Sequence, residues 1–493
     1  MELKPSKVAI TDTLGSRNYT ELVLRIDKIT SGFITDLKLT VGSHAAIVAS
    51  NSIEYLEVVC GASQAGVALA TINPSLSMVE IKSICDDAEA RVLFADAKSF
   101  ERLQECSFNS VEKIITFGPE FEGWVSKIDP VCTFPVISQE DVFTIPYTSG
   151  TTGRPKGVLV SHRSRILTLQ AMAQEYGCYS EDDRFLAMTP LCHGAGMVFG
   201  LASLYFGGYV QLMNQFDPER VISCLHQENI TGVFMVPTHF HSIFALSDDI
   251  LEQHRGTNLL SIISNAAPLP QQTKERIIDY FGEDLLHETY GSTEAGIVSN
   301  LRPAYQLTKR NCVGLPFDST RISLKNESGN ECGVDEAGEL FSTGPFLFNG
   351  YWKNQTETDA AFQDGWVSVG DIARKDADGY LYIIDRKKDM VISGGVNIYP
   401  SEVESVLAQH PSIVEAGVIG VPDEKWGERL KAFVVITTDE AFSLDQVISF
   451  SEARLAKYKV PKEFEIIPQL PRNASGKLLK AALRERRQLS LDN

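Results

Sequence analysis

The sequence predicts an α/β protein that is built from several structural units, and three observations carry this prediction. The chain has 493 residues, more than one hydrophobic core usually organises, so roughly two to four units are expected. Short β-branched runs alternate with helical patterns through most of the chain. After about residue 310 shorter strand-like runs with Gly and Asp turns take over, which is typical of a small antiparallel or barrel unit.

The strand-like runs of the first part are apolar and have the length of buried strands. They cover residues 44–50, 66–72, 91–95, 113–117, 209–213, 232–236 and 260–264. Residues 53–68 have helical spacing and lead from the first run into the second. Because apolar strands that alternate with helices form parallel sheets covered on both faces, we expect such sheets here.

The second part of the chain divides at a charged junction. Strand-like runs at 321–324, 338–342 and 379–384 lead to this junction at 385–390, and an α+β pattern follows it. We therefore place the main domain boundary there, with one domain at residues 1–386 and a second at residues 387–493.

Charge and cysteine content restrict the classes of partner and compartment. The formal net charge is −19, and such a surface repels nucleic-acid phosphates, so no nucleic-acid partner is expected. The nine cysteines include no C-x-x-C pair, which argues against a zinc ribbon or a disulfide framework and favours a reducing compartment. No signal-peptide pattern and no membrane-spanning run is seen, so we expect the cytoplasm. A homodimer is left open.

The most informative segment has the sequence Tyr147-Thr-Ser-Gly-Thr-Thr-Gly-Arg-Pro-Lys-Gly157. It lies between two apolar runs, so it is predicted to be a loop between strands. Its glycines let backbone N–H groups approach an anion, its hydroxyls add donors, and Lys156 supplies positive charge for a polyphosphate. The spacing fits neither a Walker A loop nor a Rossmann glycine motif. A flexible linker is the alternative, but linkers rarely combine so many hydroxyls with a closing Pro-Lys-Gly.

This segment resembles the signature loop of the adenylate-forming superfamily, which includes acyl-CoA synthetases, aryl-CoA ligases, luciferases and amino-acid adenylation domains. Further motifs similar to the family's follow in the family's order at 190–194, 264–269, 290–294, 370–371, 385–389, 393–400 and 471–478. The resemblance implies a large N-terminal domain with two α/β sheet subdomains and a small β-barrel, then a small mobile α+β domain. It also implies ATP- and Mg²⁺-dependent activation of a carboxylic acid to acyl-AMP, followed by transfer to CoA.

The resemblance implies a nucleotide site whose residues come from most of these motifs. They are Thr148, Ser149, Gly150, Thr151, Thr152 and Lys156 for the phosphates, Ala266, Ala267, Tyr290, Gly291, Ser292 and Thr293 for adenine and α-phosphate, and Asp371, Arg386 and Asn397 for ribose and neighbouring groups. Glu294 is implied to bind Mg²⁺, a hard cation that prefers carboxylate and phosphate oxygens. Taken alone, residues 290–294 would suit the capped start of a helix.

Two further residues are implied to act on the reacting groups. Lys477 matches the family's catalytic lysine, whose charge would stabilise the pentavalent phosphorus of the first step. Taken alone it would be a solvated surface lysine. His193 matches the residue that gates the carboxylate pocket, with Thr293 and Glu294 beside the reacting phosphate.

Lys388 occupies the hinge position about which the C-terminal domain would rotate between the two half-reactions.

The acceptor and the acid are less defined. Gly395, Trp426, Tyr458 and Lys462 match positions that family ligases use for CoA. Residues 194–202 contain no acidic residue, which favours a fatty or aryl acid over an amino acid. Two alternatives stay open, namely an enzyme that loads the phosphopantetheine of a carrier protein and a catalytically silent nucleotide-binding relative. His239 and His241 lack a third ligand spaced nearby and are interpreted as structural.

Overall fold

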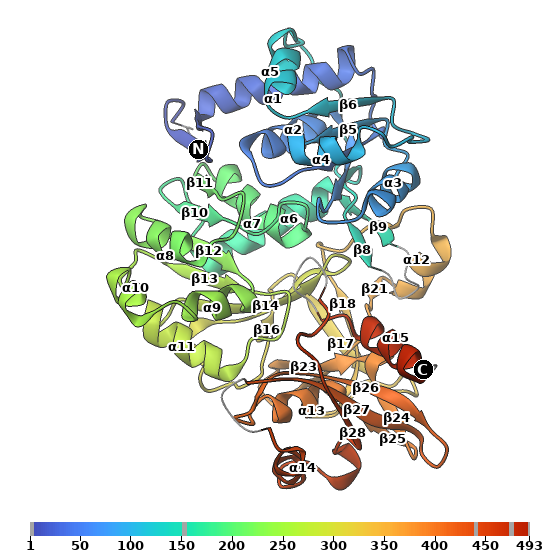
Figure 1. Cartoon of the computed structure of the whole chain (residues 1–493). Helices are drawn as coiled ribbons and strands as arrows, with labels where there is room; N and C mark the ends of the chain where they lie inside the picture. Colours follow the sequence, from blue (N-terminus) through green and yellow to red (C-terminus); the bar gives the residue numbers. More distant parts are fainter. Residues whose placement is uncertain (1–3, 150–154, 438–441, 473–477, 492–493) are drawn as a thin grey trace. The chain divides into compact units, whose positions relative to one another are not determined.

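The computed structural model describes residues 4–149, 155–437, 442–472 and 478–491. The chain forms two compact units, one of Met1–Arg321 with Ser342–Val367 and the other of Ile322–Phe341 with Ser368–Asn493 (Figure 1). The predicted α/β class with several sheets is confirmed. The boundary predicted at residue 386, between a fixed domain and a mobile one, stays a prediction.

The first unit contains an eight-stranded sheet with the order β19-β9-β7-β4-β3-β5-β6, and β8 pairs with β9 outside this path. Its strands are β3 (His44–Val48), β4 (Ala68–Ile72), β5 (Val92–Ala95), β6 (Lys113–Thr116), β7 (Val142–Thr144), β8 (Tyr147–Ser149), β9 (Pro155–Ser161) and β19 (Gly350–Tyr351). Strands β7, β4, β3, β5 and β6 are parallel, as the apolar runs predict. Strand β9 is antiparallel to its three neighbours.

Helices alternate with these strands and have well-defined ends. They are α1 (Tyr19–Thr35), α2 (Ile53–Ala65), α3 (Met78–Asp87), α4 (Ala97–Leu103), α5 (Pro119–Ser126) and α6 (His162–Tyr176). Helix α2 begins after Ser52, whose hydroxyl accepts the Tyr55 N–H, and ends at Gly66, whose φ of +71° closes the helix. Helix α3 begins with a capping box between Ser77 and Glu80. Local sequence therefore determines where these helices start and stop.

A nine-stranded sheet forms the other half of the first unit, with the order β16-β15-β14-β13-β12-β10-β11-β1-β2. Its strands are β1 (Val8–Thr11), β2 (Ser16–Asn18), β10 (Arg184–Ala187), β11 (Tyr209–Leu212), β12 (Gly232–Met235), β13 (Ser261–Ser264), β14 (Leu286–Ser292), β15 (Gly296–Leu301) and β16 (Leu315–Pro316). The central strands β14 to β1 are parallel, and the edges are antiparallel. Its helices are α7 (Gly194–Tyr205), α8 (Pro218–Gln227), α9 (Pro237–Phe244), α10 (Asp248–Gln253), α11 (Gln271–Phe281) and the 3-10 turn η1 (Pro303–Tyr305).

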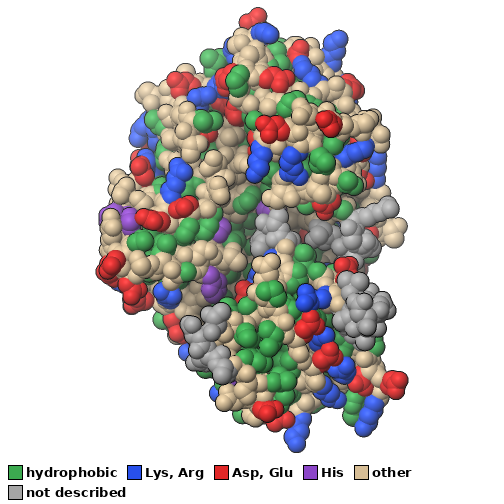
Figure 2. All heavy atoms as spheres, viewed as in Figure 1, with side chains coloured by type: hydrophobic (Ala, Val, Ile, Leu, Met, Phe, Trp, Pro, Cys, Tyr) green, Lys and Arg blue, Asp and Glu red, His purple; other side chains and the backbone are tan. Residues whose placement is uncertain are grey.

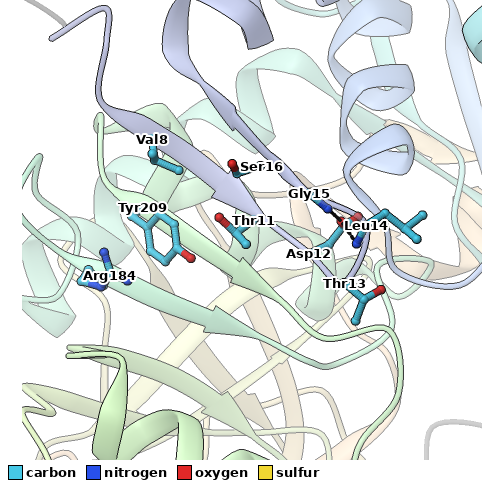
Figure 3. Close-up of a pocket in the computed structure, with 9 residues that line it drawn as sticks. All are labelled: Val8, Thr11, Asp12, Thr13, Leu14, Gly15, Ser16, Arg184 and Tyr209. Atoms are coloured by element: carbon cyan, nitrogen blue, oxygen red, sulfur yellow. Dashed lines mark hydrogen bonds between the residues drawn. The ribbon is translucent and has the colours of Figure 1, made fainter.

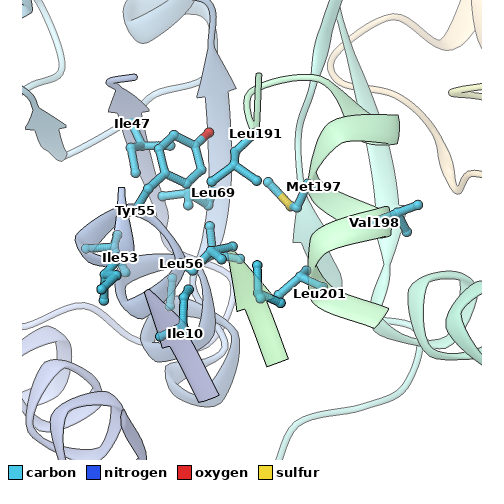
Figure 4. Close-up of a cluster of buried hydrophobic side chains, with 14 of the residues drawn as sticks. Ile10, Ile47, Ile53, Tyr55, Leu56, Leu69, Leu191, Met197, Val198 and Leu201 are labelled. Carbon is cyan, nitrogen blue, oxygen red and sulfur yellow. The ribbon is translucent and has the colours of Figure 1, made fainter. Parts of the chain in front are cut away.

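The two sheets of the first unit share one hydrophobic core. Figure 4 shows side chains of β3, β4 and α2, among them Ile47, Leu56 and Leu69, against Met197 and Leu201 of α7. Because the same buried cluster contains residues of both sheets, the strand ends of one sheet are held close to the loops of the other. This packing brings together segments that are far apart in the sequence.

The strands between residues 310 and 390 pair in antiparallel fashion, as predicted. This part of the chain contributes residues to both units. Its elements are β17 (Arg321–Lys325), β18 (Gly338–Thr343), α12 (Gln355–Ala361), β20 (Phe362–Gln363), β21 (Trp366–Val367), β22 (Asp371–Lys375), β23 (Leu381–Arg386) and η2 (Lys387–Asp389). Strand β18 pairs with β22 through Gly338 and Glu339. The implied barrel form of this region stays a prediction.

The rest of the second unit is the predicted α+β segment. An antiparallel sheet with the order β25-β24-β27-β26 has β28 added parallel to β27. The elements are β24 (Val391–Ser393), β25 (Val396–Ile398), α13 (Pro400–Leu407), β26 (Ile413–Asp423), β27 (Gly427–Ile436), α14 (Leu444–Glu452), η3 (Lys457–Lys459), β28 (Glu463–Ile466) and α15 (Lys480–Leu491).

The surface and the thiols add three observations. On the face drawn in Figure 2, basic and acidic side chains are interspersed. All nine cysteines are free thiols. Within the described ranges, no helix combines the length and the apolar character that crossing a membrane would require.

Candidate active site

The segment 147–157 forms an antiparallel hairpin at its two ends. Tyr147 pairs with Gly157 and Thr148 pairs with Lys156, so the prediction of a loop over the whole segment is wrong at these positions. A Cβ at Gly157 would lie 2.9 Å from Ile145 Cγ2 and 3.0 Å from the Tyr147 ring, so glycine is needed for this pairing. The backbone of Ser149 is the last described part of β8. Gly150, Thr151 and Thr152 lie outside the described residues.

Lys156 contacts one acidic and one aromatic side chain that come from other parts of the sequence. Its Nζ pairs with Glu357 Oε2 at 2.7 Å and lies 5.5 Å from the centre of the Tyr351 ring. The Tyr351 hydroxyl in turn donates to Glu294 Oε1 at 3.0 Å. Strand β19 pairs with β9, which places Tyr351 next to the hairpin. The fold therefore brings the lysine of one motif and the glutamate of another to the same aromatic ring.

Tyr351 and Glu357 are site residues that the sequence reasoning missed. They lie about two hundred residues after Lys156, and no local pattern around them indicates an anion site. Asn354 caps helix α12 by accepting the Glu357 N–H at 3.2 Å, which orients the first turn of the helix. A capping Asn followed by Glu would have predicted only the start of a helix.

The segment 290–294 leaves strand β14 and turns sharply into β15. Ser292 Oγ accepts the Ala295 N–H at 2.9 Å. A Cβ at Gly291 would lie 2.2 Å from the Gly296 carbonyl oxygen, and Gly296 has a φ of +69°. The predicted strand end is confirmed, and the alternative of a capped helix start is wrong because β15 follows at once.

A buried polar network supports β14 below this turn. Tyr176 Oη and Thr289 Oγ1 are 2.7 Å apart, and Thr289 donates to Asn300 Oδ1 at 3.0 Å. The Asn300 amide donates to Glu175 Oε1 at 2.8 Å and lies 2.9 Å from His287 Nδ1. Burial lowers the pKa of His287 to about 4, so the ring is neutral near pH 7. These bonds fix strand β14, on which Tyr290 lies.

The segment that the resemblance assigns to adenine follows β13. Ala266 has a φ of +76°, which is unusual for a residue with a side chain, and its N–H is accepted by Asn265 Oδ1. Ala266 is exposed and Ala267 is half-buried. The Leu269 N–H donates to Glu288 Oε1 at 3.3 Å, so β14 holds the end of this segment.

His193 lies directly before helix α7, in the loop that the sequence singled out. Its Nε2 is 3.3 Å from Asn73 Nδ2, at the end of β4. Burial lowers the pKa of His193, so the ring is neutral near pH 7. A Cβ at Gly196 would lie 2.2 Å from the Pro190 carbonyl oxygen, so glycine is required for the loop to approach the helix.

Asp371 and Arg386 meet within the second unit. Gly370, with a φ of +75°, makes the predicted turn, and Asp371 pairs with Arg386 across β22 and β23. Arg386 Nε lies 3.1 Å from Asp371 Oδ1, and the Asp371 side chain is only 7% exposed. Asn397 donates to Glu327 Oε1 at 2.9 Å.

The implied hinge residue lies in the 3-10 turn η2. Burial lowers the pKa of Lys388, and the nearby guanidinium groups of Arg386 and Arg484 act in the same direction. Arg484 also donates to Asp389 Oδ1 at 2.7 Å. The turn is therefore bound to helix α15 of the same unit.

The residues implied for CoA lie around an exposed indole. Trp426 is 42% exposed, and the Nζ atoms of Lys425 and Lys462 are 4.8 and 5.7 Å from the ring centroid. A Cβ at Gly394 would lie 2.7 Å from the indole. The structure thus brings Trp426 and Lys462 together, next to the glycine pair that includes Gly395. Tyr458 is 50% exposed in η3, with Lys459 Nζ 5.9 Å from its ring.

Lys477 lies outside the described residues, and only its flanks have a described structure. Arg472 and Leu478 form an isolated antiparallel bridge, and Arg472 pairs with Glu415 at 2.7 Å. Lys480 pairs with Glu404 at 2.8 Å.

Two other features, the pair His239 and His241 and a hollow near β1, are not part of the candidate active site. His239 Nδ1 accepts the Val236 N–H at 3.4 Å, and its ring stacks on Phe216 with centroids 4.3 Å apart, which agrees with a structural role. Among the described residues, no group of three or more His, Cys, Asp or Glu is placed to hold a metal ion. A hollow of about 570 Å³ lies near β1, and Figure 3 shows the residues that line it. Its nine lining residues include none of the predicted site residues; they are Val8, Thr11, Asp12, Thr13, Leu14, Gly15, Ser16, Arg184 and Tyr209.

Comparison with known proteins identifies the family of this chain. The model of the AMP-binding enzyme family matches residues 1–352, and that of the AMP-binding enzyme C-terminal domain matches residues 402–477. Feruloyl-CoA synthase of Amycolatopsis sp is 34% identical over 490 residues, which cover 98% of this chain and 96% of the relative. The 2-succinylbenzoate–CoA ligase of Bacillus licheniformis is 33% identical over 492 residues, with coverages of 98% and 97%.

A solved structure agrees in fold as well as in sequence. The o-succinylbenzoate CoA synthetase of Bacillus subtilis, in complex with its acyl-adenylate intermediate, superposes with a TM-score of 0.87. The two sequences are 29% identical, and the match covers 98% of this chain and 96% of that one.

Two α/β sheets on a shared core, and a glycine-rich hairpin whose lysine pairs with the Glu357 carboxylate, agree with the class of the adenylate-forming enzymes. Within that class, the chain belongs to the AMP-binding enzyme family, in its acyl-CoA ligase branch. It is an AMP-forming acid–thiol ligase. The family predicted from the sequence motifs is thereby confirmed.

Proposed function

We propose that the protein activates a carboxylic acid with ATP and Mg²⁺ and transfers the acyl group to CoA. In the first step a carboxylate oxygen attacks the α-phosphorus, the acyl–phosphate bond forms, and pyrophosphate leaves. In the second step the thiol sulfur attacks the acyl carbon, AMP leaves, and the thiol proton is released. The observation that carries the proposal is that Lys156 and Glu294 both contact Tyr351, Lys156 at the ring and Glu294 at the hydroxyl.

Lys156 is suited to bind the β- and γ-phosphates. Its side chain is only 12% exposed, and its present partner, the Glu357 carboxylate, is 36% exposed. A polyphosphate carries more negative charge than one carboxylate, so it would displace Glu357 from the ammonium group. The hydroxyls of Thr148 and of Ser149, Thr151 and Thr152 would add donors.

Glu294 fits the proposed role of Mg²⁺ ligand. One of its carboxylate oxygens already accepts the Tyr351 hydroxyl at 3.0 Å, which holds the side chain in one orientation. Mg²⁺ usually takes one or two carboxylates together with substrate phosphates, so a single glutamate suffices on the protein side. The ion would neutralise charge on the phosphates as pyrophosphate leaves.

The residues of the second unit complete the proposed roles. The Asp371 carboxylate can accept the ribose hydroxyls, with Arg386 as its neighbour. Lys477 is proposed to bridge the carboxylate and the α-phosphate in the first step. We propose that residues 387–493 rotate about Lys388 between the two steps, as one domain against residues 1–386. The bond from Arg484 to Asp389 would keep the C-terminal side of that hinge attached to its own domain.

The indole site supports CoA as the acceptor. An exposed Trp426 offers a face on which an adenine ring can stack, and Lys425 and Lys462 supply charge for phosphates. A carrier-protein phosphopantetheine has no adenine, so it would not use this face. That difference separates the proposed acceptor from the first alternative.

The acid is proposed to be an aryl acid. Both relatives described above act, by their names, on aromatic acids. The first turns of α7 carry no charged side chain, and Gly291, Ile297 and Val298 would line a neutral pocket beside it. The cytoplasm and a homodimer stay predictions about the compartment and the assembly.

The first experiment measures pyrophosphate release with ATP, Mg²⁺ and a panel of acids, with and without CoA. The panel contains cinnamates, benzoates, fatty acids of several lengths and amino acids. Release that requires an aryl acid and increases with CoA supports the proposal. Release that depends on the acid but not on CoA favours a carrier protein as acceptor. ATP binding without release for any acid would support the silent relative.

Two variants and a control locate the chemistry. Lys156→Ala is expected to raise the KM for ATP, while the exposed Lys98→Ala is the matched control. Lys477→Ala is expected to abolish adenylate formation but to leave thiolysis of a supplied acyl-adenylate largely intact. Equal loss in both half-reactions would contradict the role proposed for Lys477.

A further inference from the structure

The loop that carries His193 is held by polar side chains at the ends of β3 and β4. Asn51 Oδ1 accepts the Leu191 N–H at 2.8 Å, and Asn51 Nδ2 donates to the Thr189 carbonyl oxygen at 3.0 Å. The buried Thr71 hydroxyl donates to the Cys192 carbonyl oxygen at 2.9 Å. Because these bonds connect the two sheets of the first unit, the loop has one defined position relative to β4.

A third polar residue, Asn73, reaches the histidine ring itself. Its Oδ1 accepts the Ser75 N–H at 2.8 Å, and its Nδ2 lies 3.3 Å from His193 Nε2. A backbone N–H can only donate, so the amide oxygen must face Ser75 and the amide nitrogen must face the ring. The amide nitrogen also only donates, so the facing ring nitrogen must be the acceptor.

The turn that contains Asn73 is itself braced. The Arg102 guanidinium donates to the carbonyl oxygens of Pro74 and Leu76, each at 2.6 Å. Two bonds from one planar group hold these carbonyls in a fixed geometry. The Asn73 side chain therefore extends from a rigid turn, and its orientation toward His193 does not depend on a flexible loop.

We infer that Asn73 is a positioning residue that holds His193 as the neutral tautomer with its proton on Nδ1. His193 then acts as a hydrogen-bond donor through Nδ1, and it acts neither as a base through Nε2 nor as a cation. No partner for Nδ1 occurs among the described residues, so this N–H is available to a substrate oxygen. The role toward the acid rests on the proposed function, whereas the tautomer does not.

The chemical consequence concerns the reacting acid. A neutral donor can hold a carboxylate or acyl oxygen without forming an ion pair that would lower the nucleophilicity of the carboxylate. A hydrogen bond in a site from which water is excluded is stronger than the same bond in water. The ring stays neutral near pH 7 because burial lowers the pKa of His193.

The tautomer is measured directly by ¹⁵N NMR of the ring nitrogens in histidine-labelled enzyme. His193→Gln identifies the signals of this ring among the nine histidines. The expected result is a protonated Nδ1 and an unprotonated Nε2 at pH 7.5 in the full chain without substrates. A protonated Nε2 would overturn the inference whether or not the protein activates acids.

Two substitutions of Asn73 test the cause. Asn73→Asp presents only acceptors, so Nε2 is expected to take up a proton and the signal pattern to reverse. Asn73→Ser keeps an acceptor for the Ser75 N–H but cannot reach the ring, so both tautomers are expected to appear. Asn258→Asp, the same change at an exposed amide, is the matched control and is expected to leave the His193 signals unchanged.

The effect on activity is measured with the acid found by pyrophosphate release. For Asn73→Ser, kcat is expected to fall about 2- to 10-fold, the value of one neutral hydrogen bond, with the KM for ATP unchanged. Asn73→Asp is expected to lose activity more steeply as pH falls, because its carboxylate favours the imidazolium. A wild-type tautomer in both variants would overturn the role of Asn73. If both variants reverse or mix the tautomers while kcat stays at the wild-type value, the tautomer has no role in catalysis.

Discussion

Lys274 on α11 and Glu288 on β14 form an ion pair that is almost completely buried, with side-chain exposures of 0% and 8%. Glu288 also accepts the Leu269 N–H, so the pair supports the end of the segment assigned to adenine. Burial raises the pKa of Glu288, and the Lys274 ammonium opposes that rise. The substitution Lys274→Met removes the charge and keeps a side chain of similar length, which limits the cavity that is left.

The expected cost follows from the charge that stays behind. Breaking a buried pair by removing one partner costs about 3–5 kcal/mol, because the other charge has no compensation. The double variant Lys274→Met with Glu288→Gln removes both charges and keeps an oxygen for the Leu269 N–H. Its free energy of unfolding is expected within about 1 kcal/mol of wild type, since buried pairs contribute little relative to neutral groups of the same shape.

The assay is urea unfolding of wild type, both single variants and the double variant, followed by intrinsic fluorescence. The coupling free energy between the two positions is expected to be about 2–4 kcal/mol. In Lys274→Met the pKa of Glu288 rises further, so the native state holds a proton that the unfolded chain loses, and the deficit grows as pH rises from 5 to 8. The reasoning from an uncompensated Glu288 charge would be contradicted by either of two results. One is a double variant whose loss of unfolding free energy equals the sum of the two single losses, and the other is a loss in Lys274→Met that does not change with pH.

Burial lowers the pKa of His287 to about 4, so the free energy of unfolding is unaffected by this group above about pH 6.5 and decreases as pH is lowered toward 4. His287→Gln is expected to remove about 1–3 kcal/mol of that decrease. Urea unfolding of both proteins at pH 7 and pH 4.5 measures the difference. Glu357→Gln removes the carboxylate that pairs with Lys156, so the KM for ATP is expected to fall about 2- to 5-fold. An unchanged or higher KM would count against the displacement of Glu357 by phosphates. Trp426→Ala should raise the KM for CoA about tenfold and leave pyrophosphate release without CoA unaltered, whereas an equal effect on both would place the indole elsewhere in the reaction.

The elements that the sequence predicted well are those that depend on neighbouring residues. The apolar runs at 44–50 and 66–72 became the parallel strands β3 and β4, because a fully buried strand needs apolar side chains on both faces. The Gly370 turn before Asp371 and the strand end at Tyr290 were predicted for similar local reasons. The segment 147–157 was only partly predicted, since its ends pair as a hairpin whose register depends on Tyr147 and Gly157 together.

The family, the order of the motifs and the residue types that a nucleotide and an acid require follow from the amino-acid sequence alone. Which of these residues meet depends on how the chain folds. Lys156 and Glu357 are 201 positions apart, and Asn73 and His193 are 120 apart, so no local pattern connects either pair. The physical reason is that such pairs form where two sheets and a β-edge close on a common core. Local spacing encodes helices and turns, whereas these contacts arise from the packing of elements that are distant in the chain.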